Sequence, residues 1–137
     1  MIIHSEQEMI THGRHLSQYL VLPSTVELIG DIGAGKTTLV KGIAQGLGIT
    51  TDITSPSFVI SKTYHSQTKP ITLTHFDFYR LADPGIMREQ LAESINDPHT
   101  ITIIEWASTV KNLLPKNHTT ITVTYNDDNT RTIKVKK

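Results

Sequence analysis

Apolar residues recur along this chain with two different periods. Spacings of three or four residues, typical of helices with one buried face, predict helices over residues 5–20, 36–46 and 83–96. Short apolar runs and strict alternation predict strands at residues 26–29, 58–64, 71–76, 101–105, 121–125 and 133–135. Because strands and helices alternate through most of the chain, the pattern predicts an α/β fold.

Polar segments mark where elements begin and where strands turn back. Ser5 to Glu8 has the form of a capping box, and Asp83-Pro84 supplies a cap and a proline suited to the first turn of a helix. The polar loops 65–70 and 126–129 each separate two strand-like stretches. We therefore expect two antiparallel hairpins beside a parallel core.

Size and composition limit the kind of protein that this sequence encodes. A chain of 137 residues has room for one domain, and we expect residues 1–137 to form it. Cysteine is absent, which excludes disulfides and thiolate metal sites. No apolar run approaches the ~18 residues of a membrane span, and the start of the chain does not resemble a signal peptide, so we expect a cytoplasmic protein. Thirteen basic residues balance thirteen acidic ones, which argues against an extended basic surface for DNA or RNA.

The segment Gly30–Thr38 carries the most specific chemistry in the sequence. It reads G-D-I-G-A-G-K-T-T, which matches the pattern G-x-x-x-x-G-K-[ST], and it lies between a predicted strand and a predicted helix. Glycines let the backbone N–H groups of such a loop approach phosphate oxygens closely. The sequence therefore predicts a P-loop NTPase-like three-layer sandwich, with a mostly parallel central sheet plus antiparallel hairpins.

Three side chains after the glycines have expected roles on a bound nucleoside triphosphate. Lys36 would reach the β- and γ-phosphates, and the Thr37 hydroxyl would coordinate the Mg²⁺ that accompanies the nucleotide. The Thr38 hydroxyl would lie near the α-phosphate.

Two carboxylates end predicted strands and are candidates for chemistry at the γ-phosphate. Glu105 follows an apolar run, at a place where phosphate-loop nucleotidases hold Mg²⁺ directly or through water. Asp77 shares a strand face with His75 and Tyr79, and it could orient the attacking water, accept its proton or hold a magnesium-bound water. The plainer interpretations are an ordinary strand end for Glu105 and a structural hydrogen bond between Asp77 and His75.

Four segments, in this order, resemble the TsaE (YjeE) family of small bacterial ATPases. They are G-D-I-G-A-G-K-T-T at 30–38, S-P-S-F at 55–58, H-F-D-F-Y-R at 75–80 and E-W at 105–106. Only the first is specific by itself, and the others gain weight from their order and spacing. The resemblance implies an ATPase that supports threonylcarbamoyl adenosine modification of tRNA with the TsaB–TsaD complex, and that meets tRNA only through this complex.

The resemblance also implies roles for individual residues. Phosphate contacts would come from Gly33, Ala34, Gly35, Lys36, Thr37 and Thr38, with ATP and Mg²⁺ as the cofactors. Thr37 and Glu105 would ligate Mg²⁺, and Asp77 would be the hydrolytic or water-holding carboxylate.

Several positions depart from the family pattern or are open to two interpretations. The family usually has threonine where Met9 and Ser57 stand, which leaves nucleotide contacts from the first helix without support. The segment 54–58 lies where related nucleotidases have switch loops. Arg131, in the last hairpin, either approaches the adenine side or is a solvated arginine of an edge strand.

The main alternative function is a small-molecule kinase, which would also carry a phosphate loop. A kinase needs an acceptor pocket and usually an arginine-rich lid, whereas the four arginines here, at 14, 80, 88 and 131, are dispersed. A GTPase would carry the guanine-reading motif N-K-x-D, which does not occur in the sequence. A nucleotide-gated scaffold without hydrolysis overlaps with the ATPase and differs from it only in whether Asp77 and Glu105 are needed for turnover.

Overall fold

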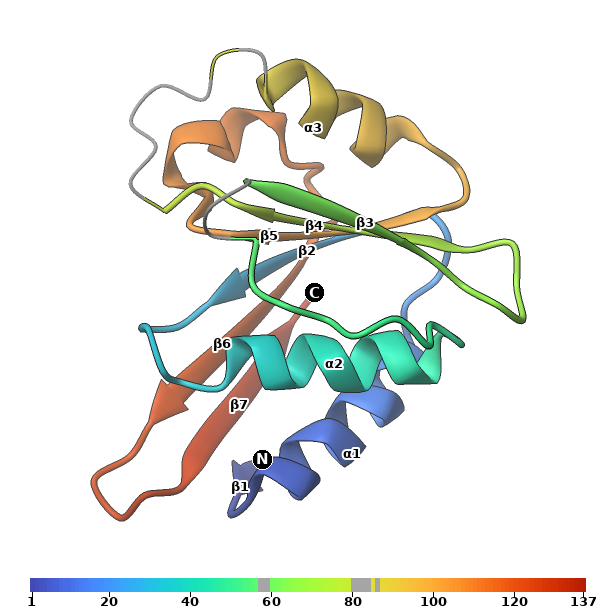
Figure 1. Cartoon of the computed structure of the whole chain (residues 1–137). Helices are drawn as coiled ribbons and strands as arrows, with labels where there is room; N and C mark the ends of the chain where they lie inside the picture. The colour runs from blue at the N-terminus through green and yellow to red at the C-terminus, as the bar shows by residue number, and fades with distance from the viewer. Residues whose placement is uncertain (57–59, 80–84, 86) are drawn as a thin grey trace.

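The computed structural model describes residues 1–56, 60–79, 85 and 87–137. Within these ranges a seven-stranded sheet, in the order β1-β7-β6-β2-β5-β4-β3, separates two layers of helices (Figure 1). Helices α1 (Glu6–Ser17) and α2 (Lys36–Gly46) cover one face, and α3 (Met87–Asn96) and the 3₁₀ helix η1 (Ala107–Leu113) cover the other. The predicted α/β sandwich is confirmed.

Parallel strands form the centre of the sheet, and antiparallel pairs lie on both sides. The parallel strands are β6 (Thr119–Tyr125), β2 (Ser24–Ile29), β5 (Thr100–Glu105) and β4 (Thr72–Asp77). The antiparallel strands are β3 (Ser61–His65) against β4, β7 (Arg131–Lys136) against β6, and β1 (Ile2–Ile3) against β7. Both predicted hairpins are therefore confirmed.

The buried apolar residues fall into two clusters, one for each helical layer. The larger cluster packs α1 and α2 on the sheet through residues such as Val26, Leu39 and Ile43. The smaller cluster lies under α3 and η1, where the Phe76 and Phe78 rings stack at 5.8 Å between centroids. The two faces of the central strands are thus both buried, as expected for parallel strands.

The start of α1 has the capping serine that the sequence predicts. Ser5 caps α1 by accepting a hydrogen bond from the Glu8 N–H at 3.1 Å. The Glu8 carboxylate accepts a hydrogen bond from the His4 N–H at 2.7 Å, one residue before the cap, so the capping box is closed one position earlier than in its standard form. The predicted helix start at Asp83-Pro84 and the strand start at 58 and 59 lie outside the described residues.

Within the described ranges, no helix combines the length and the apolar character needed to cross a membrane.

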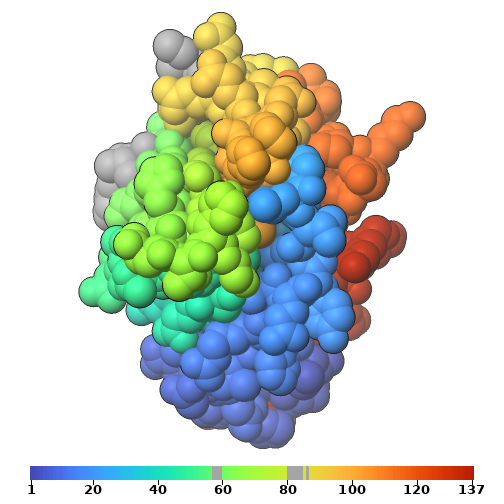
Figure 2. All heavy atoms as spheres, turned by 90° about the vertical axis from the view of Figure 1, so that its right-hand side faces the viewer, coloured from blue at the N-terminus to red at the C-terminus, as the bar shows by residue number. Residues whose placement is uncertain are grey.

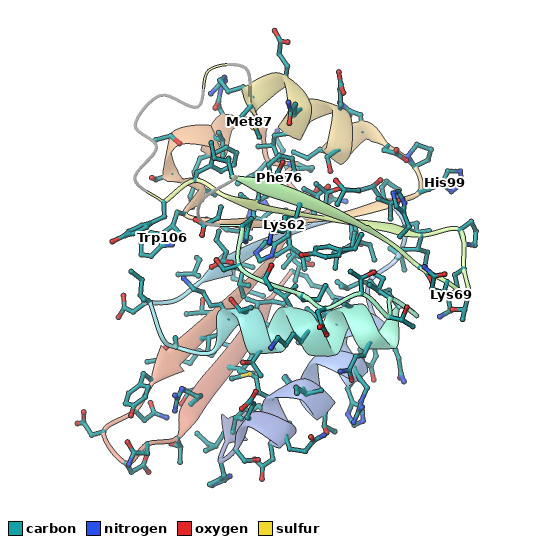
Figure 3. All side chains as sticks on the ribbon, viewed as in Figure 1. Lys62, Lys69, Phe76, Met87, His99 and Trp106 are labelled. Atoms are coloured by element: carbon teal, nitrogen blue, oxygen red, sulfur yellow. The ribbon has the colours of Figure 1, made fainter. Side chains whose placement is uncertain are left out.

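The carboxyl ends of β2, β4 and β5 meet at one edge of the sheet. Figure 3 shows Trp106 at this edge, and Lys69 and His99 at the opposite one. Figure 2 looks onto that opposite edge, where the loops from α1 to β2 and from β3 to β4 form much of the surface. Because open α/β sheets bind ligands beyond the carboxyl ends of their strands, we expect a functional site at the edge that carries Trp106.

Candidate functional site

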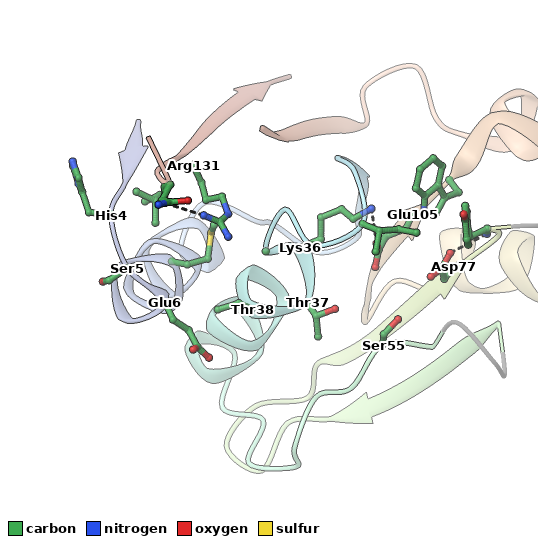
Figure 4. A pocket seen from close by; sticks show the side chains of 18 residues that line it. His4, Ser5, Glu6, Lys36, Thr37, Thr38, Ser55, Asp77, Glu105 and Arg131 are labelled. Atoms are coloured by element: carbon green, nitrogen blue, oxygen red, sulfur yellow. Dashed lines mark hydrogen bonds and ion pairs between the residues drawn. The ribbon is translucent and has the colours of Figure 1, made fainter. Parts of the chain in front are cut away.

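A cleft of about 950 Å³ lies at the carboxyl ends of β2, β4 and β5 (Figure 4). Of the residues proposed from the sequence, those that line it are Gly33, Gly35, Lys36, Thr37, Thr38, Asp77 and Glu105. Ala34 is buried instead, with 1% of its surface exposed. The fold thus brings the glycine loop together with Asp77 and Glu105, which lie on two other strands.

The glycine-rich loop between β2 and α2 has a backbone that requires glycine. Gly33 has a φ of 84° and Gly35 a φ of 102°, both in the left-handed region. The Ala34 N–H donates to the Asp31 carbonyl at 3.1 Å, and the Ala34 carbonyl accepts from Arg131 Nε at 3.1 Å. The loop is therefore held at its middle by a strand from the far end of the chain.

Lys36, the first residue of α2, turns inward to the end of the neighbouring strand. Its Nζ donates to the Gly30 carbonyl and lies 3.2 Å from Glu105 Oε1. The same ammonium group lies 4.7 Å from the centre of the Trp106 ring. The side chains of Lys36 and Glu105 are only 8% and 5% exposed, so this ion pair is almost fully shielded from water.

Glu105 lies between two nitrogen donors. Its Oε2 is 2.6 Å from His75 Nε2, while its Oε1 is the oxygen that meets Lys36. Burial by itself raises the pKa of Glu105, but the hydrogen bond from His75 and the charges of His75 and Lys36 outweigh it, and the pKa lies below the ordinary value of 4.5. Glu105 is therefore ionised at neutral pH.

Asp77 ends β4 directly beside Glu105, which is its partner in the parallel register. It is 4% exposed, and its Oδ1 accepts a hydrogen bond from the Tyr79 N–H at 2.9 Å. The hydrogen bond between Asp77 and His75 that the plainer interpretation expected is not formed among the described residues, because the imidazole bonds to Glu105. The two carboxylates thus share one wall of the cleft.

The other end of the cleft is formed by the start of α1 and the start of β7. Figure 4 shows His4, Ser5, Glu6 and Arg131 at this end. Met9, on α1, and Asn129, just before β7, also line the cleft. The Arg131 guanidinium lies 4.1 Å from the centre of the Tyr125 ring, and its Nη1 donates to the Asn129 carbonyl at 3.0 Å. Of the two interpretations of Arg131, the one in which it is a solvated arginine of an edge strand is therefore wrong.

The residues at this second end were mostly missed in the sequence. Nothing near Glu6 distinguishes it from any exposed residue in the first turn of a helix, and Arg131 meets the loop across 97 positions of sequence. Ser55, from the proposed switch segment, lines the cleft as expected, whereas Ser57, Phe58 and Arg80 lie outside the described residues.

The donor groups of the cleft suit a magnesium nucleotide. The Thr37 hydroxyl and the ionised Glu105 offer hard oxygen ligands on the walls of one cavity, and Mg²⁺ commonly takes one or two protein oxygens and completes its shell with phosphate and water. The cation Lys36 and the start of α2 favour an anion at the same place. The residues present therefore fit Mg²⁺ and a phosphate chain.

Comparison with known proteins gives one consistent family. The family model described as "Threonylcarbamoyl adenosine biosynthesis protein TsaE" matches residues 3–133. The chain is 34% identical over 131 residues to the tRNA threonylcarbamoyladenosine biosynthesis protein TsaE of Haemophilus influenzae, which covers 92% of this chain and 82% of that protein. It is 37% identical over 131 residues to the protein of the same name from Treponema pallidum, covering 96% of this chain and 95% of the relative.

A solved structure supports the same relationship. The crystal structure of Bacillus subtilis YdiB matches this structure with a TM-score of 0.79 and 28% sequence identity. The match covers 97% of this chain and 80% of the YdiB chain.

Proposed function

Since this chain belongs to the TsaE family, which takes part in tRNA threonylcarbamoyladenosine biosynthesis, we propose that it binds and hydrolyses Mg-ATP to support that modification. One observation carries the proposal. A single cleft joins a left-handed glycine loop, the Lys36 ammonium, the Thr37 hydroxyl and two buried carboxylates. This is the set of groups that phosphoryl transfer to water needs.

Each residue has a proposed task on the bound nucleotide. The backbone of residues 33–38 would hold the phosphates. The Lys36 ammonium group would leave Glu105 and bind the β- and γ-phosphates instead. The Thr37 hydroxyl and Glu105 Oε1 would hold Mg²⁺, which when bound neutralises charge on the phosphate oxygens. Asp77, beside Glu105, would orient the attacking water or accept its proton.

We further propose that the ATPase acts with TsaB and TsaD and that it meets tRNA only through them. The family name supports a place in this pathway. The equal numbers of basic and acidic residues support an indirect contact with RNA, because direct binding relies on an excess of basic groups facing the phosphates.

The test is phosphate release from ATP by the purified chain, measured with and without TsaB and TsaD. We expect slow release by the chain alone, faster release with the partners, and loss of release in Glu105→Ala. Glu93→Ala is the matched control, because Glu93 is an exposed glutamate on α3, away from the cleft. Release that is equally fast in Glu105→Ala would refute the proposed site, and turnover that appears only after a small hydroxyl compound is added would identify a kinase instead.

A further inference from the structure

His75 is a fully buried histidine that the proposed ATPase chemistry leaves without a task. It lies in β4 with 0% exposure, and its Nε2 is 2.6 Å from Glu105 Oε2. Its Nδ1 is also buried and has no hydrogen-bond partner among the described residues. An apolar side chain of similar size would fill this place without leaving a buried nitrogen unpaired, so packing alone does not explain a histidine here.

The register of β4 and β5 explains how His75 reaches Glu105 from the interior of the sheet. In the β4–β5 register His75 pairs with Ile103, and Asp77 pairs with Glu105. All four side chains are on the sheet face that carries α2, because strand positions two apart share a face. His75 is therefore one step deeper in the sheet than Glu105, and among the described residues it is not part of the cleft lining.

The direction of the hydrogen bond follows from the groups involved. An ionised carboxylate can only accept hydrogen bonds, so the hydrogen between the two side chains belongs to His75 Nε2. The two carboxylate oxygens of Glu105 therefore have different partners. Oε2 is held by the imidazole, and Oε1 is directed to Lys36 at the wall of the cleft.

We propose that His75 is the positioning residue for Glu105. By holding Oε2, it keeps the flexible glutamate side chain in one orientation, so that Oε1 faces the place where a magnesium ion would be bound. The inference rests on the proposed function, since it assigns His75 to the metal end of that site. His75 touches neither nucleotide nor metal, and it acts only through Glu105. Partners that orient a ligand in this way typically contribute 10–100-fold to metal affinity.

Two amide variants separate positioning from a merely structural role. In His75→Gln the side-chain nitrogen can occupy about the place of Nε2, whereas in His75→Asn the side chain is one bond shorter and cannot reach Oε2. We expect His75→Asn to weaken the apparent affinity for Mg²⁺ about tenfold at saturating ATP, and His75→Gln to stay within about threefold of the unaltered protein. ATP affinity without Mg²⁺, measured by calorimetry in EDTA, should be unchanged in both.

A double variant tests whether His75 acts through Glu105. In a Glu105→Ala background, His75→Asn should have no further effect on Mg²⁺ dependence, because the group that His75 orients is gone. An additional loss in the double variant would overturn the proposal. So would equal Mg²⁺ affinities in the Asn and Gln variants, or a parallel loss of Mg²⁺-free ATP binding.

A spectroscopic measurement on the protein without nucleotide completes the test. Imidazole ¹H–¹⁵N correlation spectra should show His75 protonated at Nε2, with a proton signal that shifts in Glu105→Ala. Protonation at Nδ1 alone would overturn the proposal. Absence of Mg²⁺-dependent ATP binding in the unaltered protein would refute the proposed function and the positioning role with it, whereas normal binding with unchanged Mg²⁺ dependence in His75→Asn would refute the positioning role alone.

Discussion

At the scale of single residues, the central feature is the buried ion pair between Lys36 and Glu105. Breaking such a pair by removing one partner leaves the other charge buried and poorly compensated. Lys36→Met keeps much of the side-chain stem but removes the ammonium group. We expect it to lower the free energy of unfolding by about 3 kcal/mol at pH 7, measured by urea unfolding. Lys41→Met, on the same helix, is the control.

The effect of Lys36→Met should depend on pH in a defined direction. The pKa of Glu105 in the folded protein is lower than its ordinary value of 4.5, so the ionised carboxylate stabilises the fold above pH 4.5. This contribution is lost as the pH falls below 4.5 through the folded-state pKa. The stability difference between the unaltered protein and Lys36→Met should therefore shrink below pH 4.5. A difference that stays constant down to pH 3 would contradict the role of the pair.

Asp77→Asn separates binding from hydrolysis. The Asn oxygen can still accept the hydrogen bond from the Tyr79 N–H, so the end of β4 should keep its shape. ATP affinity should stay within a few-fold, while hydrolysis falls by more than about tenfold because the proton acceptor is lost. Calorimetry and phosphate release measure the two quantities. Parental turnover in Asp77→Asn would make Asp77 a structural residue.

Single residues could be assigned from the sequence only where the motif is local. Lys36 and Thr37 follow the loop glycines directly, and both lie in the cleft. The bond between His75 and Glu105 was not predicted, because it spans 30 positions and depends on which strands are neighbours in the sheet. The sequence pattern places His75 and Asp77 on one face of a strand, and it does not indicate that β5 lies beside them.

At the scale of elements, α1 and α2 pack so closely that a methyl group does not fit between them. A Cβ atom added at Gly42 would lie 2.2 Å from the Ile10 carbonyl oxygen, a backbone atom that can move only with its helix. We expect Gly42→Ala to destabilise the fold by about 3 kcal/mol, and to weaken ATP binding because the start of α1 lines the cleft. Urea unfolding and calorimetry would measure both effects.

Gly46→Ala is the matched control for this packing. The atom nearest to an added Cβ there is the Ser17 hydroxyl oxygen at 2.0 Å, which can rotate away, and the nearest atoms that cannot are the Ser17 Cβ at 2.9 Å and the Arg14 carbonyl oxygen at 3.0 Å, farther off than the Ile10 carbonyl oxygen is from Gly42. Its cost in unfolding free energy should therefore be smaller than that of Gly42→Ala. The reverse order would show that the contact between Gly42 and the Ile10 carbonyl is not the one that limits the packing of the two helices.

Elements with regular patterns were predicted well, and irregular ones were not. The strands β2, β4, β5, β6 and β7 and the helices α1 and α2 follow the apolar periods of the sequence. The strand β1 has only two residues, too few for a period to be seen. The 3₁₀ helix η1 was missed because it begins after Trp106, whose φ of 56° is uncommon for a residue other than glycine and has no sequence signal.

At the scale of the whole molecule, ligand binding and folding stability are linked. A ligand that binds only the folded protein stabilises it by about 2.7 kcal/mol when its concentration is 100 times its Kd. We expect ATP to raise the urea midpoint, and Mg²⁺ to raise it further. Thr37→Val, which replaces the hydroxyl by a methyl group, should keep the increase seen in EDTA and lose the part that depends on Mg²⁺. An unchanged Mg²⁺-dependent increase would remove Thr37 from the metal site.

The overall fold could be predicted from the sequence more completely than the set of residues that line the cleft. The glycine motif between a strand and a helix was enough to predict the layered α/β fold. The Arg131 end of the cleft was not predictable, because β7 reaches the loop only through the order of the strands in the sheet. That residues 1–137 form a single domain stays a prediction.

Trp106 gives this molecule a natural optical reporter. It is the single tryptophan of the chain, it packs against Tyr79 with 4.8 Å between ring centroids, and the Lys36 ammonium lies over its ring. An indole changes its emission when a nearby charge moves. If Lys36 leaves Glu105 for a phosphate, the fluorescence of the unlabelled protein should follow that movement directly, and each step of nucleotide entry could be timed in a stopped-flow instrument without attaching a dye.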